Sequence, residues 1–261
     1  MNREAVVTAF YNYTSNYNPE NPKIKLKIDH TYRVADLAVT IAKDIRADAD
    51  LAWLCGMLHD IGRFEQVTRY NTFSDALSVD HALLGAEILF QEGLIKEMCP
   101  NLGEYEISIL EKAIRNHSAY RIEAGLNNIE TTYCNILRDA DKIDIFRVNC
   151  DTPLEEIYNI STAELRASSV SEEVKECFRN ETAVLRELKK LPADFVVGHL
   201  CLIFELVYPI SLTIAREQGY VDKLLSFESN NPETRDWFEY MKTKYRSYAN
   251  NDSVKIADIN M

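Results

Sequence analysis

The amino-acid sequence predicts an all-α fold, on three observations. Apolar residues recur at steps of three and four along most of the chain, which is the period of an amphipathic helix. Only 8 glycines and 7 prolines occur among the 261 residues, which leaves room for long helices. No segment alternates apolar and polar residues as a half-buried strand would. The length suits one large domain, or a core domain with an added subdomain.

Six helices are predicted in the first part of the chain, at residues 3–17, 29–45, 48–61, 79–97, 104–117 and 130–148. The first ends at the Asn-Pro-Glu-Asn-Pro stretch of 18–22. The second carries Val34, Ala38 and Ile41 on one face. Residues 48–61 are apolar almost all round, which indicates a helix buried at the centre of the domain. Residues 63–78 are mostly polar and are predicted to form a loop at the rim of a pocket.

Four further helices are predicted beyond the turn at Asp151-Thr152-Pro153, at residues 153–167, 170–190, 194–217 and 232–248. The domain organisation that follows has an N-terminal helix and linker at 1–22 and a core at 23–150. A C-terminal helical region at 151–249 is expected to pack on this core, and the tail at 250–261 is expected to be mobile.

Charge and cysteine usage narrow the class of protein. The formal net charge is −12, so the chain lacks the basic footprint of a nucleic-acid-binding protein. There is no run of about 18 apolar residues and no signal peptide at the N-terminus, so no membrane association is expected. Six cysteines at wide spacings, with no Cys-x-x-Cys pair, indicate free thiols in a reducing compartment. We therefore expect a cytoplasmic protein, and we make no prediction of its oligomeric state.

Four of the five histidines form an ordered series with two aspartates, made up of His30, His59, Asp60, His81, His117 and Asp141. Helical spacing places these residues on the apolar faces of several different helices. His30, for example, lies four residues before Val34 and seven before Leu37. A buried carboxylate costs several kcal/mol unless it is paired, hydrogen-bonded or bound to metal. The series therefore predicts one shared metal site.

The ligand types indicate the class of metal. Imidazole and carboxylate donors without thiolate suit Fe, Mn, Co, Ni or Zn. Six protein ligands exceed the needs of one tetrahedral ion, so two divalent ions bridged by Asp60 are predicted. His30, His59 and Asp141 would bind one ion, and His81 and His117 the other. Two ions about 4 Å apart can hold the attacking and leaving oxygens in phosphoryl transfer.

The pattern resembles the HD-domain superfamily of metal-dependent phosphohydrolases. The resemblance covers about residues 25–148 and rests on His30, on the doublet in LHDIGRFEQ and on the aspartate of RDADKID. His81, in SVDHALLGAEIL, and His117, in IRNHS, are similar to the additional ligands of the dinuclear members. The resemblance implies an all-α helical bundle, here with additional C-terminal helices. The chain lacks a GYP motif after the HD signature, so a cyclic-di-GMP phosphodiesterase of that subclass is not expected.

The predicted function is hydrolysis of a phosphate ester or anhydride, on a nucleotide or another small phosphorylated metabolite, by metal-activated water. Asp60 is predicted to be catalytic as the bridging ligand, Arg63 to bind a substrate oxygen with its guanidinium fork, and Lys142 to add positive charge. The four-histidine, two-aspartate set also occurs in the di-iron oxygenases of the superfamily. A di-iron oxygenase acting on a polar small molecule, or a non-catalytic metal-stabilised sensor, is therefore the alternative. His199 lies in an apolar segment and is predicted to be a core histidine.

Overall fold

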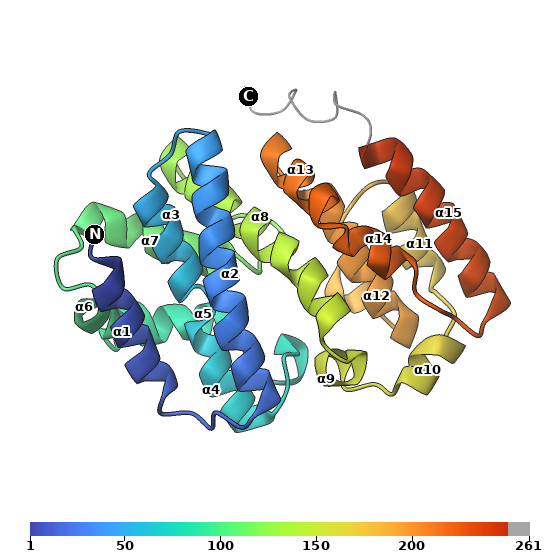
Figure 1. The fold of residues 1–261 in the computed structure, drawn as a ribbon, viewed down its shortest axis with the longest axis horizontal. Coiled ribbons are helices and arrows are strands. Elements are labelled where there is room, and N and C mark those ends of the chain that lie inside the picture. The colour runs from blue at the N-terminus through green and yellow to red at the C-terminus, as the bar shows by residue number, and fades with distance from the viewer. Residues whose placement is uncertain (250–261) are drawn as a thin grey trace. The chain divides into compact units, whose positions relative to one another are not determined.

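The computed structural model describes residues 1–249, and this part of the chain is helical with no strand (Figure 1). The prediction of an all-α fold is therefore confirmed. None of the described helices combines the length and the apolar character needed to cross a membrane. The predicted tail at 250–261 lies outside the described residues.

The chain divides into two compact units, and the boundary between Asp141 and Lys142 falls inside a long helix, α8. The helices of the first unit are α1 (Arg3–Thr14), α2 (Pro22–Asp44), α3 (Ala49–Leu58), α4 (Ile61–Tyr70), α5 (His81–Ala86), α6 (Leu94–Met98), α7 (Glu104–Asn116) and the start of α8 (Asn128–Asp151). A 3-10 turn covers Asp75–Leu77, and a π-helical turn covers Glu87–Gln91. The predicted domain boundaries stay predictions.

The second unit begins with the end of α8. Its other helices are α9 (Leu154–Tyr158), α10 (Thr162–Ala167), α11 (Glu172–Arg179), α12 (Pro192–Leu200), α13 (Pro209–Gln218), α14 (Tyr220–Leu225) and α15 (Pro232–Ala249). Two 3-10 turns cover Arg186–Leu188 and Cys201–Glu205. Phe178, Phe204 and Trp237 pack edge-to-face in its core. His199 is half-buried within this unit, with its Nδ1 2.7 Å from Tyr158 Oη and 2.9 Å from Asn149 Oδ1.

The predicted loop at 63–78 is wrong over its first half, because α4 covers Ile61–Tyr70. Ile61, Phe64 and Val67 are buried at steps of three, an apolar stripe that the polar residues between them concealed. The chain leaves α4 at Asn71, which adopts a left-handed conformation. The predicted helix at 48–61 is correspondingly shorter, since α3 ends at Leu58.

Other predicted helices begin or end elsewhere for local reasons. The second helix begins at Pro22 instead of residue 29, because the Asn21 side chain accepts a hydrogen bond from the Lys23 backbone N–H at 2.9 Å. Left-handed residues at Gly93 and Asn159 divide the predicted helices 79–97 and 153–167. Proline at 209 starts a new helix within 194–217, and the segment 170–190 is helical only over α11 and one 3-10 turn. Helix α14 was not predicted.

Helices α2 and α3 pack against each other at Gly56 (Figure 1). A Cβ atom at this position would lie 2.5 Å from Ala35 Cα and 2.7 Å from Ala35 N, both backbone atoms of α2. Only glycine therefore permits this separation of the two helices. The contact matters for the site because α2 carries His30 and α3 leads directly into His59.

We expect Gly56→Ala to lower the free energy of unfolding by about 1–3 kcal/mol, because the added methyl group would force the α2 backbone away. Urea unfolding monitored by circular dichroism measures this. Gly103→Ala is the matched control, since a Cβ there meets only the flexible carboxylate end of Glu106. Equal stabilities of the two variants would contradict the close packing of α2 on α3.

An aromatic cluster fixes α1 and the segment after it against α4. Phe10, Tyr13 and Tyr17 surround Phe64, with ring centroids 5.5–6.0 Å from it. Tyr17 Oη lies 2.8 Å from Glu65 Oε1, to which it donates, and 2.8 Å from Tyr13 Oη. Burial raises the pKa of Tyr13 to about 12, and it also raises the pKa of Tyr17.

These tyrosines predict a loss of stability in alkali. Their folded-state pKa values exceed the unfolded value of about 10. The stability that the two neutral tyrosines contribute to the fold is therefore fully present below about pH 10. It is lost as the pH rises through about 12. Between about pH 9 and pH 11, the wild-type protein should lose about 1 kcal/mol more free energy of unfolding than the double variant Tyr13→Phe/Tyr17→Phe. The free energy of unfolding is measured by urea titration at the two pH values. An equal loss in the wild-type protein and in the double variant would refute the assignment of this pH dependence to Tyr13 and Tyr17.

Candidate metal centre

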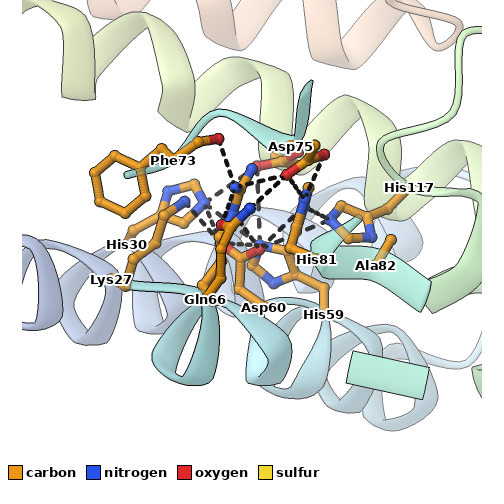
Figure 2. A network of polar contacts seen from close by, with 12 residues as sticks. Lys27, His30, His59, Asp60, Gln66, Phe73, Asp75, His81, Ala82 and His117 are labelled. Atoms are coloured by element: carbon orange, nitrogen blue, oxygen red, sulfur yellow. Dashed lines mark hydrogen bonds and ion pairs between the residues drawn. The ribbon is translucent and has the colours of Figure 1, made fainter. Parts of the chain in front are cut away.

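The structure brings the six predicted ligands together in the first unit, although they come from five separate segments. Figure 2 shows Asp60 among the four histidines. His30 lies in α2, His59 and Asp60 in the turn between α3 and α4, His81 at the first residue of α5, His117 at the end of α7 and Asp141 in α8. The four histidines and Asp60 are buried, and the Asp141 side chain is 13% exposed.

Asp60 lies at the centre of the cluster, and each of its oxygens faces a different pair of histidines. Oδ2 is 3.3 Å from His59 Nε2 and 3.6 Å from His30 Nε2. Oδ1 is 3.5 Å from His81 Nε2 and 3.7 Å from His117 Nε2. One carboxylate therefore divides the cluster into two halves and belongs to both.

The donor atoms within each half lie close together. In one half, His30 Nε2 is 3.3 Å from His59 Nε2 and 3.1 Å from Asp141 Oδ1. In the other half, His81 Nε2 and His117 Nε2 are 2.9 Å apart. Nitrogen atoms at these separations are suited to share a cation, because each imidazole presents a lone pair to the same point.

The second nitrogen of three rings shows that the lone pairs do point inward. His59 Nδ1 lies 2.7 Å from the Gly56 carbonyl oxygen, and His117 Nδ1 lies 2.7 Å from the Ile114 carbonyl oxygen. His81 Nδ1 lies 2.9 Å from the Asp75 carboxylate. These partners only accept hydrogen bonds, so Nδ1 carries a proton in each ring, and Nε2 is the nitrogen that can present a lone pair toward Asp60. This tautomer is the one that binds a metal ion through Nε2.

The charges in the site favour ionised carboxylates. Burial alone would raise the pKa of Asp60, but the Lys27 ammonium and His59 outweigh it and hold that pKa well below its usual range. Burial would likewise raise the pKa of Asp141. The hydrogen bond with His30 and the nearby charge of His59 outweigh burial, and the pKa of Asp141 is lowered. Burial opposes the charged form of His59, yet the Asp60 carboxylate raises the pKa of that histidine. Burial and the charge of Arg63 lower the pKa of His81 to about 4, so that ring is neutral at pH 7.

Local backbone features hold the ligands in these places. His59 and His117 each follow the last residue of a helix, and their rings turn back to a carbonyl three residues earlier. Arg138 of α8 donates to the carbonyl oxygens of Asn116, at 2.8 Å, and Ala119, which fixes the end of α7. A Cβ at Gly62 would overlap the His81 carbonyl oxygen, so this glycine lets α4 and α5 approach.

The donor set fits divalent transition-metal ions. Imidazole nitrogens and carboxylate oxygens without thiolate suit Fe, Mn, Co, Ni or Zn. The three rings with a defined tautomer are already arranged as ligands. His30, His59, Asp60, His81, His117 and Asp141 are the residues that would hold such ions.

Arg63, one of the two predicted substrate contacts, has other partners in the first unit. Arg63 Nη1 lies 2.5 Å from Gln66 Oε1, 2.8 Å from the Phe73 carbonyl oxygen and 3.1 Å from Asp75 Oδ1. Its Nε lies 3.7 Å from Asp60 Oδ1, so the positive charge does border the cluster. Lys142 is buried and follows Asp141 in α8. The catalytic roles of Arg63 and Lys142 stay predictions.

Two residues at the site were missed by the sequence reasoning. Lys27 Nζ forms an ion pair with Asp60 Oδ2 at 2.7 Å, and its side chain is only 12% exposed (Figure 2). Its spacing could have identified it, because it lies three residues before His30 on the same face of α2. Asp75 contacts His81 from a 3-10 turn, where no periodic pattern in the sequence indicates its direction.

Comparison with known proteins agrees with this geometry. Residues 28–145 match the family model described as HD domain. A tRNA (cytidine(56)-2'-O)-methyltransferase of Thermoplasma volcanium is 36% identical over 87 residues, which are 33% of this chain and 20% of that protein. The chain thus aligns with about a fifth of the length of that relative. A search of solved structures found no match. The family match spans all six residues of the cluster, and residues 28–145 of this chain form an HD domain.

Proposed function

We propose that this protein is a metal-dependent phosphohydrolase that cleaves a phosphate ester or anhydride of a nucleotide or another small metabolite. The observation that carries the proposal is the position of Asp60, whose two oxygens face two separate pairs of histidines. That arrangement suits two ions held by one bridging carboxylate. Membership of residues 28–145 in the HD family supports metal-dependent chemistry at the same residues.

The proposed mechanism divides the work between the ions and the chain. Two bound ions would lower the pKa of a water molecule and offset the charge of the phosphoryl oxygens. His30, His59 and Asp141 would hold the first ion, and His81 and His117 the second. Asp60 would fix the distance between them. No side-chain nucleophile would be required. The oxygen of water would form a bond to phosphorus, the ester or anhydride P–O bond would break, and the proton lost by the water would end on the leaving oxygen.

Positive side chains beside the cluster support an anionic substrate. Lys27 and Arg63 both border Asp60, and both lie against the ring of Phe73, at 5.3 and 5.8 Å from its centroid. The two positive charges lie beside the cluster although the net charge of the whole chain is −12. They would stabilise the added negative charge of the transition state, and Lys142 is proposed to contribute from α8.

The proposed substrate is a small metabolite rather than a nucleic acid. The acidic net charge opposes binding to an extended phosphate backbone. The activity in the name of the Thermoplasma relative is not carried over, since the alignment covers 20% of that protein. We place the activity in the cytoplasm, which is supported by six cysteines with free thiols.

Replacing the bridging carboxylate should abolish both metal uptake and turnover. Asp60→Asn keeps the shape of the side chain but removes the charge that faces both histidine pairs. We expect metal content, measured by plasma mass spectrometry, to fall below one ion per chain, and phosphate release to drop at least about 1,000-fold. The control is Asp29→Asn, the same change at an exposed position next to His30. Wild-type turnover by metal-depleted Asp60→Asn would disprove the proposal.

A di-iron oxygenase is the second candidate, because four histidines and two carboxylates are also a suitable donor set for iron. Oxygen dependence separates the two functions. We expect release of inorganic phosphate from a panel of nucleotides and sugar phosphates to be equal in air and under argon. Activity that requires O2, on any substrate of the panel, would favour the oxygenase. Metal binding without turnover of any kind would favour the sensor.

A further inference from the structure

Asp75 lies beside the proposed metal centre without facing it. Its carboxylate is 4% exposed, and both of its oxygens lie 2.9 Å from His81 Nδ1 (Figure 2). An ionised carboxylate has no proton to donate and can only accept, so the proton of His81 resides on Nδ1. The Nε2 lone pair is thereby directed toward Asp60 and His117.

Helix α4 fixes the orientation of this carboxylate. Asp75 Oδ1 accepts from Gln66 Nε2 at 2.8 Å and from Arg63 Nη1 at 3.1 Å. Gln66 is fully buried, and it also donates to Ser78 Oγ and to the Val79 carbonyl oxygen, each at 2.9 Å. The segment before His81 is therefore attached to α4, the helix that begins directly after Asp60.

The position of His81 explains why it needs a side-chain partner. His59 and His117 follow the ends of helices, and a carbonyl of the preceding turn orients each ring. His81 is the first residue of α5, so no helical turn precedes it. The orientation of this ring depends instead on a residue in the 3-10 turn of Asp75–Leu77.

We propose that Asp75 is a positioning residue that sets the metal affinity of the His81/His117 half of the site. The inference rests on the two-ion centre of the proposed function. Partners of this kind fix the tautomer and raise the basicity of the ligand, and their loss typically costs about 10- to 100-fold in metal affinity. In the other half of the centre, His30 and His59 face the opposite oxygen of Asp60, and this half should keep its affinity.

Asp75→Asn tests the tautomer directly. The oxygen of the new amide would stay with Gln66 and Arg63, because both of them are donors. Its NH2 group would then face His81 Nδ1 and favour the tautomer with the proton on Nε2. That proton would occupy the position that the metal needs, whereas Asp75→Glu preserves an acceptor and should restore part of the affinity.

The experiment is a titration of metal-depleted protein with Co²⁺. Binding is measured by isothermal calorimetry and by the visible absorption of the bound ion. Wild-type protein should bind two Co²⁺ ions per chain. Asp75→Asn should bind the first ion as before and the second about 10- to 100-fold more weakly, with loss of part of the absorption. The control, Asp80→Asn, changes a carboxylate of the same segment that caps α5 through Ala82 and Leu83. It should match the wild type, because asparagine is an equally good cap.

Three results would overturn the inference, and they are distinguishable. Two unchanged Co²⁺ affinities in Asp75→Asn would show that His81 needs no such partner. Equal weakening of both ions, together with a lower unfolding temperature of the metal-free variant, would show a general structural role. Binding of fewer than two Co²⁺ ions by the wild-type chain would contradict the two-ion centre of the proposed function. It would therefore also contradict the inference.

Discussion

The carboxylate of Asp60 is 2% exposed, and a charge at such a position costs several kcal/mol unless it is compensated. In the structure, Lys27 provides an ion pair at 2.7 Å, and four imidazoles surround the two oxygens. The other ligands are arranged around this one group. A pair of cations would compensate the carboxylate more fully than a single lysine does, which is why the proposed function follows from the burial of Asp60.

The fold holds these side chains by features of the helix ends. Two histidines follow the last turn of a helix and use its free carbonyls, which helices leave without partners at that end. A third stands at the start of a helix and depends on Asp75. Glycines at 56 and 62 allow the helices to approach closely enough for the rings to meet. Backbone geometry thus directs the imidazole lone pairs before any ion is bound.

Much of this arrangement could be predicted from the sequence. Helical spacing placed His30, His81, His117 and Asp141 on inward faces, and the structure brings these residues to one point with His59 and Asp60. Helix boundaries were less predictable, because a single left-handed residue such as Asn159 ends a helix whose apolar pattern continues. The contacts of Arg63 with Gln66 and Asp75 were not foreseen, since they depend on α4, which had been predicted as a loop. Lys27 was overlooked although its spacing to His30 indicates the same helix face.

The central claim is that Asp60 bridges two ions, and crystals of Mn²⁺-loaded protein test it most directly. An anomalous difference map recorded at the manganese edge should show two peaks, one on each side of the Asp60 carboxylate. One peak should be bounded by His30, His59 and Asp141, and the other by His81 and His117. A single peak, or a map without peaks in which Asp60 keeps its ion pair with Lys27, would contradict the account.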